Sequence, residues 1–286
     1  MVKFEDGCNS QSQIANWKGF YEYRAYFLAA AGIAEFKDCG LADVIVQQIV
    51  KWDFGDFNIQ TQVEINARAV LLETDHKKAI TALVELIHVA KSESTRWVAA
   101  RSLGKVAANN PTAIAALVEL IRDSKYESTR RKAASSLGKI AANNPTANAA
   151  LVELIRDSQS EDTRMQAASS LGKIAANNPT AITALVELIR DSQSEDTRMQ
   201  AAKSLVKIAA NNPTAITALV ELIRDSQDEF NHWQAASSLQ RLLTESENMA
   251  AVVTTLKDHL SKEAYKVIWH CAQTMTYPAF YQAWHS

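Results

Sequence analysis

The sequence is short of turn-forming residues and of any dominant charge. It contains only 8 glycines and 5 prolines among 286 residues, while alanine, leucine, isoleucine, glutamate and lysine are abundant. Such a composition favours helices and argues against an all-β fold, which needs turn residues between its strands. The formal net charge is −2, so the molecule as a whole has no field that would attract nucleic acid. An electrostatic partner must therefore be recognised by a local patch.

Cysteines and long apolar runs are also scarce. The three cysteines, Cys8, Cys39 and Cys271, are odd in number and far apart, which argues against a disulfide framework and fits a reducing interior. The first residues lack the apolar segment of a signal peptide. The longest apolar run, residues 26–34, is far too short to span a bilayer. We therefore expect a soluble, cytoplasmic protein with no membrane partner.

The chain instead contains a repeat of 34 residues. The segment Ala-Leu-Val-Glu-Leu-Ile recurs at this spacing, with its first leucine at Leu83, Leu117, Leu151, Leu185 and Leu219. The segment Asn-Asn-Pro recurs at the same spacing, ending at Pro111, Pro145, Pro179 and Pro213. A fixed period of this length indicates a solenoid. A solenoid offers a long repeated surface rather than one pocket, so the pattern favours binding over catalysis.

Each repeat reads as a hairpin of two helices, which we name helix A and helix B. In one copy, Asn144 is a good N-cap for helix A, and Pro145 suits its first position. Ser160 is a good cap for helix B, and Asn177 ends it because Asn tolerates the left-handed conformation. Both helices carry apolar stripes at helical spacing. These stripes can be buried only against the neighbouring repeats.

The segments on both sides of the array are interpreted as diverged copies of the same helical hairpin. We expect helices over residues 20–36, 41–52, 62–73, 248–260 and 264–275, and a long loop over 51–58. The aromatic tail at Tyr277, Pro278, Phe280, Tyr281 and Trp284 is expected to fold over the final helices as a lid. The predicted fold is an all-α, right-handed superhelix of about seven helical pairs. We divide it into an N-terminal cap over 1–75, the repeats over 76–245 and a C-terminal capping segment over 246–286.

Helix B carries the residues of a known repeat. Arg164 is followed by Ala167-Ala168 and by Leu171-Gly172, which resembles the second helix of a HEAT repeat in its short, HEAT-like form. The pattern recurs after Arg96, Arg130 and Arg198, and decays in the last copy. The Trp, Leu-Gly and Tyr positions of tetratricopeptide repeats, which share the period, are absent.

The flanks carry a more specific resemblance. Residues 19–38, and residues 265–285 with their Trp-His-Cys and Tyr-Pro motifs, are similar to the regions that bracket the HEAT array in bacterial, notably cyanobacterial, NACHT-type signal-transduction NTPases. In that family an NTPase switch precedes the array, which senses a trigger or holds the switch off. This sequence lacks the phosphate loop of such a switch. The resemblance thus implies a detached C-terminal arm or a fragment of a longer protein.

Three columns of residues share one face of helix B, which we call the B face. One column is basic and consists of Lys105, Lys139, Lys173, Lys207 and Arg241. A mixed column lies one turn before it and consists of Arg101, Ser135, Ser169, Lys203 and Ser237. The third column is Trp97, Arg131, Met165, Met199 and Trp233. The stripe itself holds no carboxylate, whereas helix A carries Glu85, Glu119, Glu153, Glu187 and Glu221.

In HEAT-like solenoids helix B lines the concave side, so the resemblance implies a basic inner face with apolar ends. Such a groove suits an acidic protein segment or the NTPase module of the same system; a nucleic-acid backbone is the less expected partner. The competing interpretation is that one solvated lysine was copied with its repeat. Exposed tryptophans at the ends of the face favour binding.

Other residue sets point to structure rather than chemistry. The ladder Arg96, Arg130, Arg164 and Arg198 is predicted to tie neighbouring repeats through Asp123, Asp157, Asp191 and Asp225. His270, Cys271 and His285 lack the spacing of a zinc site, so we predict no metal and no cofactor. No catalytic set is recognisable, and we predict that the chain is not an enzyme.

The predicted function is a protein-interaction scaffold, the sensor or autoinhibitory arm of a NACHT-type STAND NTPase acting in defence signalling. The alternative comes from HEAT-like repeats that build bilin lyases, which attach chromophores to phycobiliproteins. That alternative requires a conjugation site, and the sequence shows none. The NACHT-like flanks favour the first interpretation.

Overall fold

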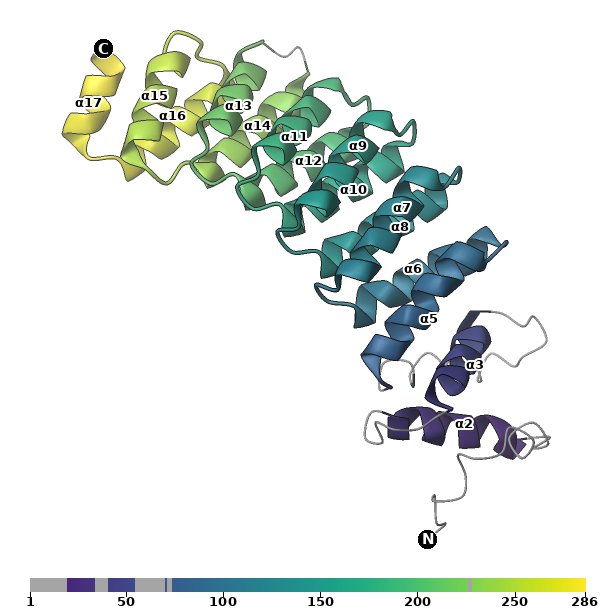
Figure 1. Ribbon diagram of the computed structural model, residues 1–286. Helices are drawn as coiled ribbons and strands as arrows, with labels where there is room; N and C mark the ends of the chain where they lie inside the picture. The colour runs from purple at the N-terminus through teal and green to yellow at the C-terminus, as the bar shows by residue number, and fades with distance from the viewer. Residues whose placement is uncertain (1–19, 34–40, 55–69, 71–73, 226–227) are drawn as a thin grey trace. The chain divides into compact units, whose positions relative to one another are not determined.

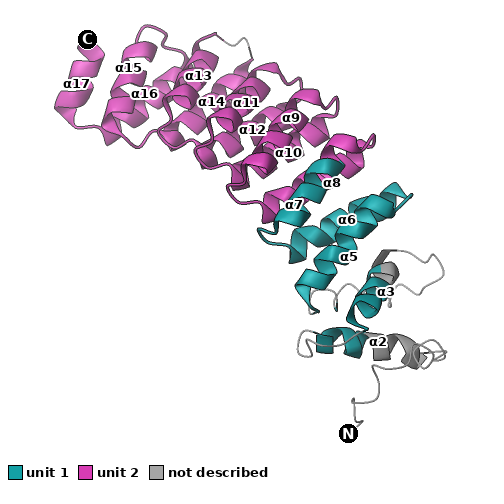
Figure 2. Cartoon of the chain, in the orientation of Figure 1, with its two compact units in different colours: residues 1–120 teal, residues 121–286 magenta. Residues whose placement is uncertain are grey.

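The computed structural model describes residues 20–33, 41–54, 70, 74–225 and 228–286, with the side chains of 20–26 and 51–54 outside the description. The described residues form fifteen helices and no strand (Figure 1). The chain divides into two compact units, residues 1–120 and residues 121–286 (Figure 2). The three-part division at residues 75 and 245 therefore stays a prediction.

The first unit contains α2 (Phe20–Ile33), α3 (Ala42–Phe54), α5 (His76–Val89), α6 (Glu93–Val106) and most of α7 (Pro111–Asp123). Helices α5 and α6 pack as a hairpin, and α3 packs on α5. The helix expected over 41–52 continues to Phe54, so the start of the loop expected over 51–58 is helical. The described part of the helix expected over 20–36 ends at Ile33, and the helix expected over 62–73 lies almost wholly outside the described residues.

The second unit is a stack of helical hairpins. Its helices are α8 (Glu127–Ile140), α9 (Pro145–Asp157), α10 (Glu161–Ile174), α11 (Pro179–Asp191), α12 (Glu195–Ile208), α13 (Pro213–Asp225), α14 (Glu229–Leu242), α15 (Ser246–Leu256), α16 (Lys262–Thr274) and α17 (Tyr277–His285). Each helix packs mainly against its hairpin partner and the helices of adjacent repeats. This nearest-neighbour packing is that of an α-solenoid, as predicted.

The Asn-Asn-Pro segment connects the repeats in the way the sequence predicts. Asn177 has a φ of 54°, which is the left-handed conformation that ends helix B. The side chain of Asn144 accepts a hydrogen bond from the backbone of Ala147 at 3.0 Å and so caps helix A. In addition, the backbone N–H of Asn177 donates to the carbonyl of Ile208 at 2.9 Å, which joins each loop to the next helix B.

Small residues bring the B helices close together. A Cβ added to Gly172 would lie 2.7 Å from Cβ of Ser204, so α10 and α12 are in tight contact there. Gly138 approaches Ser170 in the same way. The B helices consequently contact one another more extensively than the A helices do. Of two parallel rows, the more closely spaced row lies on the inside of the curve, which places the B helices on the inner side of the second unit.

The C-terminal tail differs from the lid that the sequence predicts. It forms α17, which packs mainly on α15 and only slightly on α16 (Figure 1). The hydroxyl of Thr254 donates to the carbonyl of Ala283 at 3.2 Å, and Lys257 donates to that of Trp284 at 3.4 Å. Tyr277 and Tyr281 remain exposed, because a nine-residue helix can bury only one of its sides. Helix α15 also ends at Leu256, four residues before the predicted end.

Candidate functional site

In the second unit the B face is a continuous solvent-facing strip of α8, α10, α12 and α14. Lys139, Lys173, Lys207 and Arg241 each occupy the penultimate position of their helix and are exposed. Earlier on the same side lie Arg131, Met165, Lys203 and Met199, all at least partly exposed. The structure therefore brings the predicted residues of this unit onto one surface.

The first unit carries its own short part of the B face on α6. Arg101 and Lys105 are exposed there, and Trp97 is partly exposed. These three residues lie four positions apart along one helix, so they share one side of it. This arrangement is the one that the sequence predicts for α6.

The three columns of the B face hold no carboxylate, as the sequence shows, but carboxylates border them. Arg131 on α8 forms an ion pair with Asp162 on α10, with 2.8 Å between Nη1 and Oδ2. Asp162 and its equivalent Asp196 lie in the first turn of helix B, where the helix dipole favours a negative charge. The face thus has an acidic edge at the helix starts and a basic edge at the helix ends.

The basic edge is unpaired in the described part of the second unit. Lys139, Lys173 and Lys207 take part in no ion pair there, although each lies in the last turn of its helix and complements the helix dipole. Asp162 lies about three turns from Lys173 along α10. The aspartates at the helix starts are therefore too far away to pair with the lysines at the ends of the same helices. A repeated, unpaired cation is therefore presented once per helix.

Apolar side chains lie between the two edges. Met165 and Met199 are partly exposed at the middle of the strip. Trp233 is 48% exposed, and its ring lies 5.9 Å from that of Phe230. An exposed tryptophan beside flexible methionines is typical of a surface that binds apolar side chains.

Glutamines that the sequence analysis did not single out line the same side of the B helices. Gln166 donates to Ser170 at 3.3 Å, Gln200 to Ser204 at 3.2 Å and Gln234 to Ser238 at 3.1 Å. Ser170 and Ser204 also lie at the contact between adjacent B helices, so their glutamine partners are fixed by the packing. The recurrence of Gln four residues before Ser was the available signal.

The arginine ladder has a structural role, but its predicted partners are wrong. Arg164 donates to the carbonyl of Ile155 at 3.2 Å and to Glu161 at 2.7 Å, so it joins helices A and B of one repeat. Arg96 and Arg130 make the same pair of contacts. Among the described residues these arginines form no ion pair with the predicted aspartates; the partner is instead a glutamate one turn earlier on the same helix.

Glutamates at the start of helix B tie adjacent repeats together. Ser192 donates to Glu161 at 2.6 Å, and Ser158 donates to Glu127 at 2.7 Å. Partial burial alone would raise the pKa of Glu161, but hydrogen bonds from Ser192 and Thr197 and the charge of Arg164 lower it below its ordinary value. The carboxylate is therefore held in its charged form at the seam between repeats.

Arg198 departs from the ladder. It is 8% exposed, donates to the carbonyl of Ser192 at 2.9 Å and pairs with Asp228 of the next repeat at 2.6 Å. Its guanidinium also lies 5.9 Å from the centre of the Phe230 ring. Here the predicted tie between repeats is present, through Asp228 rather than one of the predicted aspartates.

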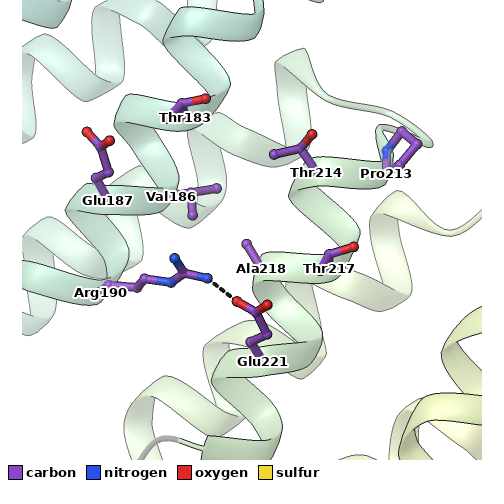
Figure 3. Close-up of a pocket in the computed structure, with 9 residues that line it drawn as sticks. All are labelled: Thr183, Val186, Glu187, Arg190, Pro213, Thr214, Thr217, Ala218 and Glu221. Atoms are coloured by element: carbon purple, nitrogen blue, oxygen red, sulfur yellow. Dashed lines mark hydrogen bonds and ion pairs between the residues drawn. The ribbon is translucent and has the colours of Figure 1, made fainter.

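The A helices carry the predicted acidic column, and its three members in the second unit are each paired with an arginine of the preceding repeat. Arg122 contacts Glu153 at 3.0 Å, Arg156 contacts Glu187 at 3.1 Å, and Arg190 pairs with Glu221. Figure 3 shows the last pair at one end of a groove of about 500 Å³ between α11 and α13. Threonines line much of this open groove, and the charges that border it belong mostly to paired side chains. The A side therefore presents balanced charge, in contrast to the basic edge of the B face.

The histidines and cysteine near the C-terminus do not converge. Cys271 is buried within α16, and burial raises the pKa of its thiol to about 11. The ring of His285 lies 4.3 Å from that of Tyr281 on α17, with the two ring planes tilted by 45°. Among the residues that the structure describes, no group of three or more His, Cys, Asp or Glu side chains could hold a metal ion.

The sequence matches two known protein families. The model of HEAT repeats matches residues 60–138, 125–206 and 148–240. The chain belongs to the HEAT-repeat family. The second model, described as NACHT C-terminal Cysteine and Histidine-containing, matches residues 257–285 of this HEAT-repeat protein, which include α16 and α17. The resemblance to HEAT repeats and that of the C-terminal segment are thereby confirmed, whereas the resemblance of residues 19–38 and the bacterial origin stay predictions.

Solved structures share the fold. The karyopherin Kap121p bound to the extreme C-terminus of the protein phosphatase Cdc14p has a TM-score of 0.58 at 11% identity, over 94% of this chain. Kap121p bound to the SUMO protease Ulp1p has a TM-score of 0.56 at 11% identity, over 93%. The match spans 34% of the Kap121p chain in both cases, about a third of its length. No curated protein matches the sequence.

Within the described ranges, no helix of the HEAT-repeat protein is both long enough and apolar enough to cross a membrane.

Proposed function

We propose that this HEAT-repeat protein is a protein-interaction scaffold and that the B face of its second unit binds an acidic segment of a protein partner. The observation that carries the proposal is the basic edge, where, among the described residues of the second unit, one exposed cation per helix faces solvent without a carboxylate partner. Methionines and Trp233 beside that edge would bury apolar side chains of the same partner.

Duplication of the repeat alone does not account for this pattern. The same copying that multiplied the lysines also multiplied the arginines of helix A, and all four are paired: Arg122, Arg156 and Arg190 with a glutamate of the adjacent repeat, and Arg224 with Asp225 of its own helix. Lys173 and its equivalents have no such partner among the described residues of the second unit. The arginines on the A side of the repeat are therefore paired, whereas the lysines of the B face remain available to a binding partner.

We further propose that the partner is the NTPase module of a NACHT-type STAND system, for which this chain is the sensor or autoinhibitory arm in defence signalling. The match of residues 257–285 to a NACHT C-terminal segment supports this assignment over the bilin-lyase alternative. A scaffold of this kind acts by binding, so its effect on nucleotide hydrolysis would come from holding the module in one conformation.

The proposal is tested with a purified NACHT NTPase module from the same source. We expect the chain to bind the module and to lower its rate of nucleotide hydrolysis, more strongly at low than at high salt. Reversing the charges in Lys139→Glu, Lys173→Glu and Lys207→Glu should weaken both effects. Unchanged binding and salt dependence in the triple variant would contradict the proposal.

A further inference from the structure

The spacing of the basic edge sets a constraint on what can bind it. Lys139, Lys173, Lys207 and Arg241 occupy the same position of four successive, packed B helices. Packed α-helices lie about 8–10 Å apart. The cations therefore form a ladder whose rungs are separated by about that distance, across the helix axes.

A polyproline II segment matches this separation best among regular peptide conformations. It has three residues per turn and rises about 3.1 Å per residue, so every third side chain points the same way at intervals of about 9 Å. Side chains on one side of a β-strand repeat at about 6.6 Å. Neighbouring side chains on one side of an α-helix repeat at about 5–6 Å. An extended chain with a carboxylate at every third residue would meet one rung per carboxylate.

We propose that the second unit binds an extended, polyproline II-like protein segment that carries an acidic residue at every third position. This inference rests on the proposed function and names the chemistry of its partner. The segment runs along the row of B helices, with its carboxylates over the lysines. Its intervening side chains lie toward Met165, Met199 and Trp233, where apolar residues are favoured.

The acidic edge of the face favours a protein segment over nucleic acid. Asp196 is exposed at the start of α12 and forms no ion pair with any described residue, so it would repel a phosphate backbone crossing the face. A strand of duplex DNA carries a phosphate about every 3.4 Å along its axis, so most phosphates would lie between rungs. A peptide can instead place uncharged residues there.

The test uses the full chain and two labelled peptides of the same length, charge and composition. One has glutamate at every third position, and the other has the same glutamates at alternate positions, with proline in both to keep them extended. With glutamates at alternate positions, about two carboxylates would not lie opposite a cation of the basic edge. Each exposed ion pair contributes about twofold in affinity. We expect the first peptide to bind about fourfold more tightly at low salt.

A matched pair of variants separates the inference from the function on which it rests. Lys139→Gln, Lys173→Gln and Lys207→Gln together should remove the preference, whereas Lys91→Gln, Lys125→Gln and Lys262→Gln, which make the same change of charge at other exposed positions, should keep it. If the wild type binds both peptides equally and the variant at Lys139, Lys173 and Lys207 binds neither, the inference is overturned and the proposed function stands. No binding of either peptide would overturn both. Tighter binding of a single-stranded oligonucleotide of equal charge would overturn the inference in favour of nucleic acid.

Discussion

At the residue scale, Asn148 on α9 is the clearest exception to the repeat pattern. It is 5% exposed and its side-chain oxygen has no hydrogen-bond partner. The sister repeats carry isoleucine at this position, as at Ile182, which is buried. Because an unpaired buried amide costs about 1–3 kcal/mol, Asn148→Ile should raise the free energy of unfolding by about that amount. Denaturant unfolding followed by circular dichroism measures the change.

The reverse substitution is the matched control. Ile182→Asn places the amide in the equivalent environment of α11 and should lower the free energy of unfolding by a similar amount. Equal stability of the wild type and Asn148→Ile would mean that the amide is hydrated in solution.

Glu161 predicts a dependence of stability on pH. Its folded-state pKa lies below the ordinary value of 4.5, so the folded protein binds this proton less readily than the unfolded chain. The stabilisation by the charged carboxylate is therefore complete well above pH 4.5 and is lost as the pH falls through the folded-state pKa. Glu161→Gln should cost about 1 kcal/mol at pH 7 and progressively less below pH 4.5.

Unfolding midpoints of both proteins at pH 7, 5, 4 and 3 test this expectation. The comparison cancels the titration of all other carboxylates. A difference that stays constant down to the lowest pH would show that the hydrogen bonds, and not the charge, are what matters.

Residue types were more predictable than residue partners. Asn177 and Ser160 were recognisable because capping depends on the local backbone alone. The contacts of Arg164 were not, because Glu161 and the carbonyl of Ile155 compete with Asp157 within reach of one flexible side chain. The structure shows that Arg164 donates to the carbonyl of Ile155 near the end of helix A and to Glu161.

At the scale of the helices, Gly172 sets the distance between α10 and α12. A methyl group there would lie 2.7 Å from both Cβ and Oγ of Ser204, on adjacent helices that pack closely. Overpacking costs about 1–3 kcal/mol and outweighs the gain of about 1 kcal/mol that alanine gives in a helix. Gly172→Ala should therefore lower the free energy of unfolding, by up to about 2 kcal/mol.

Two further substitutions identify the cause. Ser204→Gly removes the atoms that the new methyl group would meet and should rescue Gly172→Ala in a double-mutant cycle. Val206 occupies the glycine position of α12, and α12 contacts α14 less extensively than it contacts α10. Val206→Ala should thus be tolerated. Destabilisation of Gly172→Ala that Ser204→Gly does not relieve would contradict this account of the close approach.

The helices of the second unit were predictable because proline, asparagine and apolar periodicity agree in each repeat. Pro145 and Pro179 begin helices as expected. The prediction was least accurate at α15 and α17, where the repeat pattern has worn away. Nothing in the tail sequence indicates that α17 would pack on α15 rather than cover both final helices, since its aromatic residues fit either position.

At the scale of the whole molecule, nearest-neighbour packing predicts that a repeat can be removed. Residues 146–179 and 180–213 differ at only four positions, so deleting 146–179 joins two matching interfaces. The shortened chain should remain folded and helical but be less stable, because one repeat and one interface are lost. Circular dichroism and denaturant unfolding measure both properties. A chain that loses cooperative unfolding would show that the repeats depend on distant contacts.

The B face was predictable as a surface, while its charge pattern was only partly so. Helical periodicity places Lys139, Lys173 and Lys207 on one side regardless of packing. The pairing of Arg131 with Asp162 depends on the distance between two helices in adjacent repeats, which the sequence does not contain. Composition alone could not indicate an acidic partner, because the net charge of −2 does not reveal the local basic edge.

Lysine footprinting of the chain, with and without the NTPase module, tests the role of the B face most directly. Acetylation rates are read at each lysine by mass spectrometry. The account predicts that bound partner slows modification of Lys139, Lys173 and Lys207, and leaves the exposed Lys91 and Lys125 unchanged. Binding that protects only lysines outside the B face, or leaves all three as reactive as in the free protein, would contradict it.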